Sequence, residues 1–431
     1  MEKYTRENIE QLIEEDVEFV RLQFTDLFGT MKNVAITSEN LGSALEDKIQ
    51  IHASSVEGFL HEEEEDVYLK PDLSTFKILP WRPQSGKVAR IICDIRQSDG
   101  TPFCKSSRDI LRKVLEKYEQ KGYTFYSHPE CEFFLFHTDE NGMPTTMTHE
   151  QAGYLEMSPL DLGENARRDI VLTLKEMGYA VDSSHHEIAP AQHEIDFRYA
   201  KGLETADQMV TARNVIRTVA KRHGLHATFM PKPKVGVNGS GMHIHMILRK
   251  DGKNLFLDEK DPLRLSQEAY YFIGGILKNI RGITAVLNPL VNSYKRLVPG
   301  FVAPTTVGWS TKSRSALLKV TYNKEGEPRM KLQSPDASAN PYLVLALALA
   351  AGMDGIENRI LPGEPDSEKG STQKLPENLK EALECMKEDK LAIQVLGEEF
   401  FLAYLSAKEM EWEEYRRQVS AWELENYLYK I

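Results

Sequence analysis

The chain has 431 residues, which is long enough for two or three domains with a large buried core. Hydrophobic residues make up 41% and charged residues 27%, a balance that argues against disordered, collagen-like and membrane proteins. The formal net charge of −12 opposes non-specific binding to nucleic acid or to an anionic membrane. A small-molecule enzyme, or a relative of one, is therefore the first expectation.

The sequence predicts a cytoplasmic protein. Its four cysteines are scattered and form no CxxC pair, so neither a disulfide framework nor a zinc site is expected. The first ten residues are polar and charged, unlike a signal peptide. The most apolar run, Tyr342–Met353, is shorter than the ~20 residues that a membrane span needs.

The first hundred residues have a β pattern. Between Phe19 and Ile36, apolar and polar residues alternate around a turn at Asp26–Gly29, which is typical of a β-hairpin. Three further short strands are predicted at 67–69, 76–79 and 88–92, separated by loops that contain prolines. We expect a small β-rich domain that ends near residue 102.

Helices and amphipathic strands alternate from about residue 105 onward. Helices are predicted from Ser107 to a stop at Gly122, and over 165–177, 207–223 and 266–278. Strands are predicted at 132–136, 194–197, 227–230 and 242–248. This alternation is typical of an α/β or α+β catalytic domain.

Two pairs of glutamates are candidates for metal binding. Glu130 and Glu132 flank one residue at the start of an apolar strand, so alternation places both carboxylates on one face. Two carboxylates that enter a core need a cation, although an exposed strand end is an equally open interpretation. Glu187 and Glu194 lie in HHEIAPAQHEIDF, and Mg²⁺ and Mn²⁺ prefer oxygen ligands.

A glycine-rich segment, KPKVGVNGSGMHIHM (232–246), follows these glutamates. Its glycines would let the backbone close over a ligand. His243 and His245, two residues apart, would share one face of a strand. Such a loop on its own is usually only a turn.

In this order, the three elements resemble type I glutamine synthetase of the short bacterial form. Supporting segments are RLQFTDLFGTMKNV (21–34), DLGENARRDIVLTLKEMGY (161–179), NPLVNSYKRLVPG (288–300) and ANPYLVLALALAAGMDGI (339–356). The resemblance implies an α+β fold, with a β-grasp domain over 1–102 and a glutamine-synthetase-type catalytic domain over 103–431. It also implies a homo-oligomer of one or two six-membered rings, a hexamer or dodecamer, with active sites between neighbouring subunits.

In that family, ATP phosphorylates the side-chain carboxylate of glutamate and ammonia then displaces the phosphate, with divalent metals bridging the phosphates. The resemblance implies Mg²⁺ or Mn²⁺ in at least one site, and ATP as a possible ligand. It assigns the first metal to Glu132, Glu187 and Glu194, and the second to Glu130 and His243. It assigns the amino-acid substrate to Asn238, Gly239 and Arg296, and phosphate to Arg314.

Several positions depart from the family pattern. His52 stands in place of the Asp that helps to bind ammonium, and Val302 in place of the Glu that closes the site and acts as an acid or base. Lys331 replaces the Glu that completes the second metal site. Gln333 replaces an Arg that contacts the reacting groups. Lys319 replaces a second Arg on the phosphate side of the site, which keeps the charge but loses the planar guanidinium.

These changes make the predicted pocket more positive by roughly three to four charges. The neighbouring segment SPDASANPYL fixes the register around Lys331, so misalignment does not explain that change. The remaining alternative is that these are neutral substitutions at positions that tolerate change.

Three functions stay open. A non-catalytic homologue, acting as a regulator or in a mixed oligomer with an active glutamine synthetase, is favoured because metal, base, amine and carboxylate positions all change together. An ATP-dependent carboxylate–amine ligase for another amine or carboxylate would explain Val302 and Gln333. A working glutamine synthetase is supported by the end-to-end resemblance. No nucleic-acid or membrane partner is expected.

Overall fold

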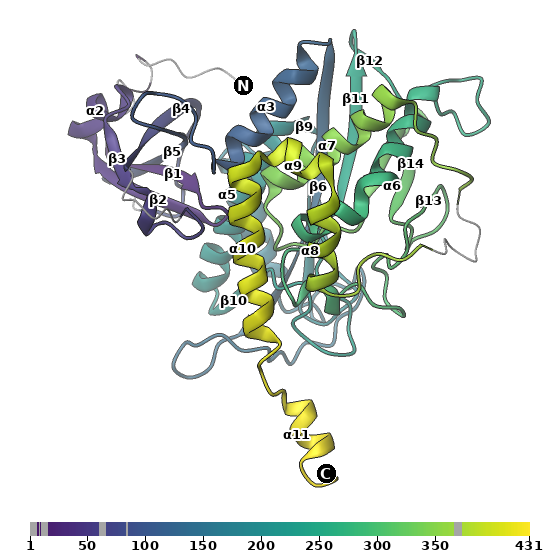
Figure 1. The fold of residues 1–431 in the computed structure, drawn as a ribbon. Coiled ribbons are helices and arrows are strands. Elements are labelled where there is room, and N and C mark those ends of the chain that lie inside the picture. The colour runs from purple at the N-terminus through teal and green to yellow at the C-terminus, as the bar shows by residue number, and fades with distance from the viewer. Residues whose placement is uncertain (1–6, 8, 10–15, 60–65, 83–84, 366–372) are drawn as a thin grey trace.

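The computed structural model describes residues 7, 9, 16–59, 66–82, 85–365 and 373–431. A small N-terminal sheet lies beside a larger part in which helices cover a second sheet (Figure 1). This arrangement agrees with the predicted α+β fold. None of the helices in the described ranges is long and apolar enough to cross a membrane.

The N-terminal sheet has the strand order β2-β1-β5-β4-β3, in which only β1 and β5 run parallel. Its elements are β1 (Val17–Thr25), β2 (Met31–Thr37), α2 (Leu41–Leu45), β3 (Ile49–His52), β4 (Asp66–Ile78) and β5 (Lys87–Arg96).

The predicted hairpin at 19–36 is confirmed by the pairing of β1 with β2. Its turn is held by Asp26, whose Oδ1 accepts backbone N–H groups from Phe28 at 3.0 Å and Thr30 at 2.8 Å. Gly29 has φ +84°, a conformation that favours glycine. A Cβ there would also lie 2.7 Å from Cγ of Asn340, so the turn packs tightly on the catalytic part.

One prediction for this sheet is wrong: the separate strands at 67–69 and 76–79 form the single strand β4. The proline that suggested a loop, Pro71, lies inside it. β3 pairs only with residues 66–69 of β4, and no other described strand pairs with that side of β4 beyond Leu69. Proline is tolerated on such an edge because no ladder hydrogen bond is lost there.

The larger sheet has the order β13-β14-β15-β11-β6-β8-β7, with β9 and β10 paired to β6 and β12 to β11. Its strands are β6 (Tyr123–His137), β7 (Val181–His186), β8 (Gln192–Phe197), β9 (Ala200–Lys201), β10 (Leu225–Thr228), β11 (Ile244–Lys250), β12 (Lys253–Asn254), β13 (Trp309–Ser310), β14 (Leu318–Tyr322) and β15 (Pro328–Leu332). The strand predicted at 132–136 is only the second half of β6. Glu130 and Glu132 therefore lie in the middle of the strand and not at its start. The first half of β6 was missed because its polar residues hide the alternation.

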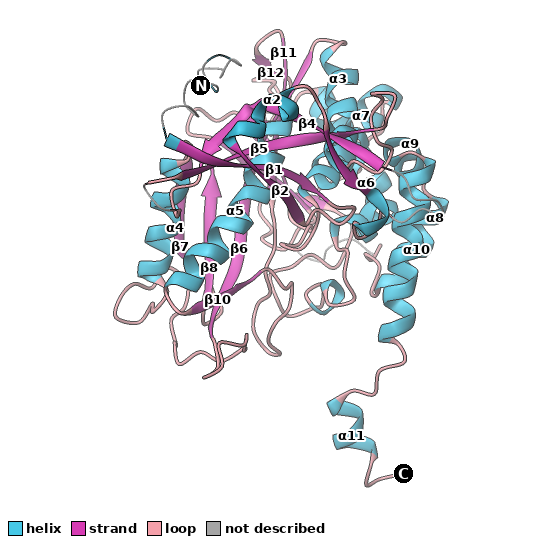
Figure 2. Ribbon diagram, turned by 90° about the vertical axis from the view of Figure 1, so that its left-hand side faces the viewer, coloured by secondary structure: helices cyan, strands magenta, loops and turns pink. Residues whose placement is uncertain are grey.

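The helices are α3 (Ser107–Glu119), α4 (Glu164–Glu176), α5 (Gly202–Arg222), α6 (Gln267–Leu287), α7 (Pro341–Asn358), α8 (Leu379–Glu388), α9 (Lys390–Leu396), α10 (Glu398–Tyr415) and α11 (Ala421–Tyr427). In Figure 2, α4 and α5 lie along the face of β6, β7 and β8. The helix predicted at 266–278 continues to Leu287. Nearly all of its second half is buried, so it has no amphipathic pattern to detect.

Arg108 of α3 connects the two parts of the chain. Its buried guanidinium donates to Asp94 and Asp72 of the N-terminal sheet, at 2.5 and 2.7 Å, and to Asp207 of α5 at 2.8 and 2.9 Å. A buried guanidinium shared among three carboxylates is strongly paired. These contacts hold the small sheet against the helices behind the larger one.

Candidate active site

A cavity of about 620 Å³ opens over the middle of the larger sheet. Of the residues that the resemblance assigns to the site or finds altered, all but His52 line it. They are Glu130, Glu132, Glu187, Glu194, Asn238, Gly239, His243, Arg296, Val302, Arg314, Lys319, Lys331 and Gln333. Segments far apart in the chain thus meet in one place, as the resemblance implies.

Strand register concentrates negative charge in this cavity. Glu132 of β6 lies directly opposite Glu194 of β8, and Glu130 lies opposite Asp196. Like charges that face each other across neighbouring strands destabilise a sheet unless a cation lies between them. The sheet therefore presents carboxylates where a cation would stabilise the fold.

Two of the carboxylates, Glu187 and Glu194, pair with no lysine or arginine among the described residues, and only His185 lies near them, at 3.8 and 3.4 Å. Burial, together with the charge of Glu132, raises the pKa of Glu187 to about 7. Burial and the charges of Glu130 and Glu132 raise the pKa of Glu194 well above its usual value. Glu187, Glu194 and His185 can bring ligand atoms within 4.8 Å of one another. Oxygen ligands with excess negative charge fit a divalent cation such as Mg²⁺ or Mn²⁺.

Glu132 is oriented by hydrogen bonds. Its Oε2 accepts the side-chain amide of Gln192 at 3.1 Å and the backbone N–H of Gly241 at 2.8 Å. A Cβ at Gly241 would lie 2.6 Å from Nη2 of Arg296, so only glycine lets the loop approach both groups. The glycine-rich segment thus packs directly against the candidate metal ligand.

Glu130 differs from these carboxylates because a lysine and two histidines donate hydrogen bonds to it. Its Oε1 lies 2.6 Å from Nζ of Lys331 and 2.7 Å from Nε2 of His245, and its Oε2 lies 2.7 Å from Nδ1 of His243. Burial alone would raise the pKa of Glu130, but hydrogen bonds from the two histidines hold it well below the usual range. The ammonium of Lys331 therefore binds the carboxylate that the resemblance assigns to a second metal.

Lys331 reaches this position through the strand register. It lies on β15, opposite His245 of β11 on one side and Lys319 of β14 on the other. Burial lowers the pKa of Lys319, and the charges of Lys331 and Arg314 lower it further. Lys331, Lys319 and Arg314 thus form a basic side of the cavity that faces the carboxylates.

The remaining altered positions have different surroundings. The side-chain amide of Gln333 donates to the carbonyls of Arg314 and Ala316, at 3.0 and 2.5 Å. It is thereby held against the backbone. Val302 is 41% exposed and adds an apolar surface to the cavity. Arg296 is buried and donates to the carbonyls of Ser334 and Gln333, at 2.9 and 3.1 Å.

His52 does not reach the cavity within one chain. It lies at the end of β3, where its Nδ1 is 2.6 Å from Oδ1 of Asp66, and both side chains are largely exposed. The resemblance placed this position in a site shared between neighbouring subunits, so its role stays a prediction.

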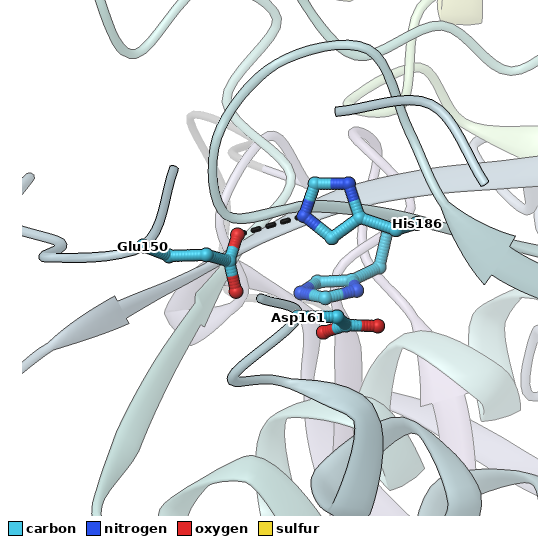
Figure 3. A group of neighbouring side chains, drawn as sticks. Glu150, Asp161 and His186 are labelled. Carbon is cyan, nitrogen blue, oxygen red and sulfur yellow. Dashed lines mark hydrogen bonds and ion pairs between the residues drawn. The ribbon is translucent and has the colours of Figure 1, made fainter. Parts of the chain in front are cut away.

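A buried polar cluster, drawn in Figure 3, includes His186, whose chain neighbours His185 and Glu187 line the cavity. Glu150 Oε1 and His186 Nε2 are 2.7 Å apart, and His186 Nδ1 is 2.6 Å from the backbone oxygen of Glu187. Asp161 is paired instead with Arg167 at 2.6 Å. Because its polar groups are largely paired with each other, this cluster fixes the backbone that carries Glu187.

Sequence reasoning missed four polar lining residues, His185, Gln192, Asp196 and Tyr154. Asp196 follows Glu194 by two residues, so strand alternation could have identified it. His185 required the pairing of β7 with β8, which places it opposite Glu194. Tyr154 lies in a loop, and no pattern in the sequence indicates its position.

Comparisons with known proteins agree with this geometry. The chain matches the family model for the glutamine synthetase β-grasp domain over residues 16–98 and that for the glutamine synthetase catalytic domain over 105–427. It is 52% identical to a glutamine synthetase of Clostridium saccharobutylicum over the full length of both chains. It is also 48% identical to one of Methanosarcina mazei, covering 98% of each chain.

Solved structures show the same fold. A structure described as "GmaS/ADP complex-Conformation 1" superposes with a TM-score of 0.89 and 30% sequence identity, covering 97% of this chain and 99% of the other. A second, described as "Apo GmaS without ligand", gives a TM-score of 0.88 and 29% identity, with coverage of 98% and 99%. The predicted fold, with its β-grasp and catalytic parts, is therefore confirmed.

Proposed function

Because the chain belongs to the glutamine synthetase family, we propose that it is a homologue that does not make glutamine efficiently from glutamate, ammonium and ATP. It acts instead as a non-catalytic or regulatory member of a ring assembly. One observation carries this proposal: the Lys331 ammonium is 2.6 Å from Glu130. A second metal beside Glu130 would have to displace that ammonium, because like charges a few ångströms apart repel strongly.

None of the altered positions is a ligand that the resemblance assigns to the first metal. Glu132, Glu187 and Glu194 would hold Mg²⁺ or Mn²⁺, and the raised pKa values of Glu187 and Glu194 support a cation there. The family uses ATP and divalent metals, and such a metal neutralises phosphate charge when bound. Arg314 and Lys319, on the basic side of the cavity, would contact the phosphates of ATP.

The other changes support the same conclusion. Val302 can neither accept a proton nor attract an ammonium ion, and the side-chain amide of Gln333 is bound to backbone carbonyls. The acid–base and charged groups that these two residues replace act on the transition state more than on the ground state. We therefore expect Asn238, Gly239 and Arg296 to bind a glutamate-like ligand without rapid turnover.

Phosphate release and glutamine formation from ATP, Mg²⁺ or Mn²⁺, glutamate and ammonium test the proposal, with each component omitted in turn. We expect glutamine formation at least ~10³-fold below that of an ordinary family member, the loss typical of removing one electrostatic or acid–base group. Glutamine formation at an ordinary rate would contradict the proposal.

Reversion variants separate the contributions. A single change such as Val302→Glu should recover little, whereas His52→Asp, Val302→Glu, Lys331→Glu and Gln333→Arg together should recover part of the activity. Groups that act as a unit are strongly non-additive. The matched control is a fourfold variant with the same charge changes at exposed positions outside the cavity.

A ligase for another amine is the second candidate, and the exposed Val302 favours it. With Phe301 and Ile188 this residue gives the cavity an apolar wall. Such a wall suits an alkylamine better than ammonium. The same phosphate-release assay with a panel of primary amines tests it. Turnover that appears only with an alkylamine and falls in Val302→Glu would favour this candidate.

A further inference from the structure

A second cavity, of about 300 Å³, lies between the β1–β2 turn and helix α5. Its lining includes Thr30 of the turn, Met31 of β2, Arg213 and Arg217 of α5, Phe229 and Ser338. None of its lining residues belongs to the cavity over the larger sheet. It is therefore a separate feature of the molecule.

Arg213 is the buried cation of this cavity. Its Nη2 donates to the carbonyl of Ala339 at 2.7 Å and contacts the sulfur of Met242 at 3.4 Å, while its buried Nε has no hydrogen-bond partner. No carboxylate forms an ion pair with it in the described part of the chain. Burial lowers its pKa to about 10. A buried charge with only neutral partners is uncompensated.

Arg217 lies one helical turn further along α5 and is exposed at the cavity. Among the described residues it forms no ion pair or hydrogen bond, and its guanidinium lies 5.1 Å from the centre of the Phe229 ring. The guanidinium of Arg213 lies 5.9 Å from the same ring. In a chain of net charge −12, two neighbouring arginines without a carboxylate partner are unexpected.

We propose that this cavity binds a small organic or inorganic anion through a carboxylate or phosphate group held by Arg213 and Arg217. The planar fork of guanidinium matches both groups in geometry. Thr30, Asn214 and Ser338 add polar groups to the lining, while Met31 and Leu290 provide an apolar wall for a short carbon chain. The volume, at the lower end of the range for ligand sites, suits a small molecule.

The position of the cavity gives such an anion a structural effect. Its walls come from the turn of the N-terminal sheet, from α5, and from residues 337–338 in the link between β15 and α7. An anion held there would contact both parts of the chain and stabilise their interface. The anion would not contact the site around Glu130 and Glu187, because the two cavities share no lining residue.

Calorimetric titration of the full-length chain with inorganic phosphate and, separately, with succinate tests the proposal. The titrations use an Arg314→Gln background, so that phosphate bound at the first cavity does not contribute. At least one anion should bind, and the tighter of the two identifies the group recognised. Arg217→Gln should weaken that binding at least ~10-fold, the loss expected for a charge-assisted hydrogen bond.

Arg222→Gln, on the same helix but outside the cavity, is the matched control and should change binding less than twofold. Arg217 is exposed, so its variant should fold, and Arg213→Lys adds a test at the buried position. As a second readout, the bound anion should raise the melting temperature of the control but not of Arg217→Gln. The proposal fails if neither anion binds, or if both glutamine variants bind equally well.

Discussion

At the scale of single residues, the first cavity divides its carboxylates into two groups. Glu130 is paired with Lys331 and hydrogen-bonded by two histidines, whereas burial and the charges of neighbouring carboxylates raise the pKa values of Glu187 and Glu194. The same sheet thus holds one carboxylate that a lysine satisfies and others that still require a cation. This difference gives two predictions about metal binding.

Replacing Lys331 by glutamate should create the second metal site. Wild-type protein should bind one Mn²⁺ per chain in equilibrium dialysis with a nucleotide, and Lys331→Glu should bind two, because Glu130 and His243 gain a third ligand. Lys324→Glu, with the same charge change in the exposed turn after β14, should stay at one. Two metals per wild-type chain would show that Lys331 can turn away from Glu130.

Metal binding should depend on pH through Glu187. Its folded pKa of about 7 lies above the ordinary value of 4.5, so in the metal-free protein its favourable contribution is complete below pH 4.5 and is lost as pH rises through 7. A metal requires the ionised form, so affinity should rise as pH increases through about 7, and ionisation of Glu194 adds to the rise.

The stability of a Glu187→Gln variant checks this sign. Without metal at pH 8 it should melt at a higher temperature than wild type, since the repulsion with Glu132 is removed, and Mn²⁺ should stabilise it less. Glu140→Gln, in an exposed turn, is the control and should behave as wild type in calorimetry at pH 5 and 8. A lower melting temperature for Glu187→Gln at pH 8 would refute the argument.

At the scale of secondary structure, the sequence predicted elements whose signals are local. The β1–β2 hairpin and α3 were found because alternation, caps and glycine stops lie within a few residues of each other. The second half of α6 was missed because burial on nearly all sides removes its periodicity. The ion pair of Lys331 with Glu130 depends on the pairing of β15, β11 and β6, which no local pattern reports.

The crossing of α6 and α7 depends on glycines. A Cβ at Gly355 would lie 1.9 Å from the carbonyl oxygen of Tyr271, so no side chain fits without moving a helix. Gly355→Ala should lower the free energy of unfolding by about 1–3 kcal/mol, as overpacking does in other cores. Urea denaturation measures this loss.

Gly42→Ala in α2 is the matched control. Nothing lies within 4 Å of a Cβ at Gly42, so alanine should be neutral or stabilising by roughly 0.5–1 kcal/mol through its better helix propensity. Equal effects of the two substitutions would mean that the helix crossing is looser than these distances indicate.

At the scale of the whole molecule, one chain leaves features without partners. Helix α11 extends away from the body, as Figures 1 and 2 show, and Trp422 and Leu428 are 60% and 67% exposed. His52 does not line the first cavity of its own chain. The family generally forms homo-oligomers, and a neighbouring subunit would account for both observations. Such contacts lie outside what a single sequence pattern can locate.

The purified protein should therefore be a hexamer or dodecamer, and α11 should contribute to its interfaces. Exposing apolar side chains to water is unfavourable in free energy, and burial against another chain removes that exposure. Light scattering should show a smaller assembly after deletion of residues 418–431, and a partial loss in Trp422→Ala. Glu425→Ala, on the same helix, should assemble as wild type. A stable wild-type monomer at micromolar concentration would exclude the ring, and with it any mixed ring formed with an active glutamine synthetase.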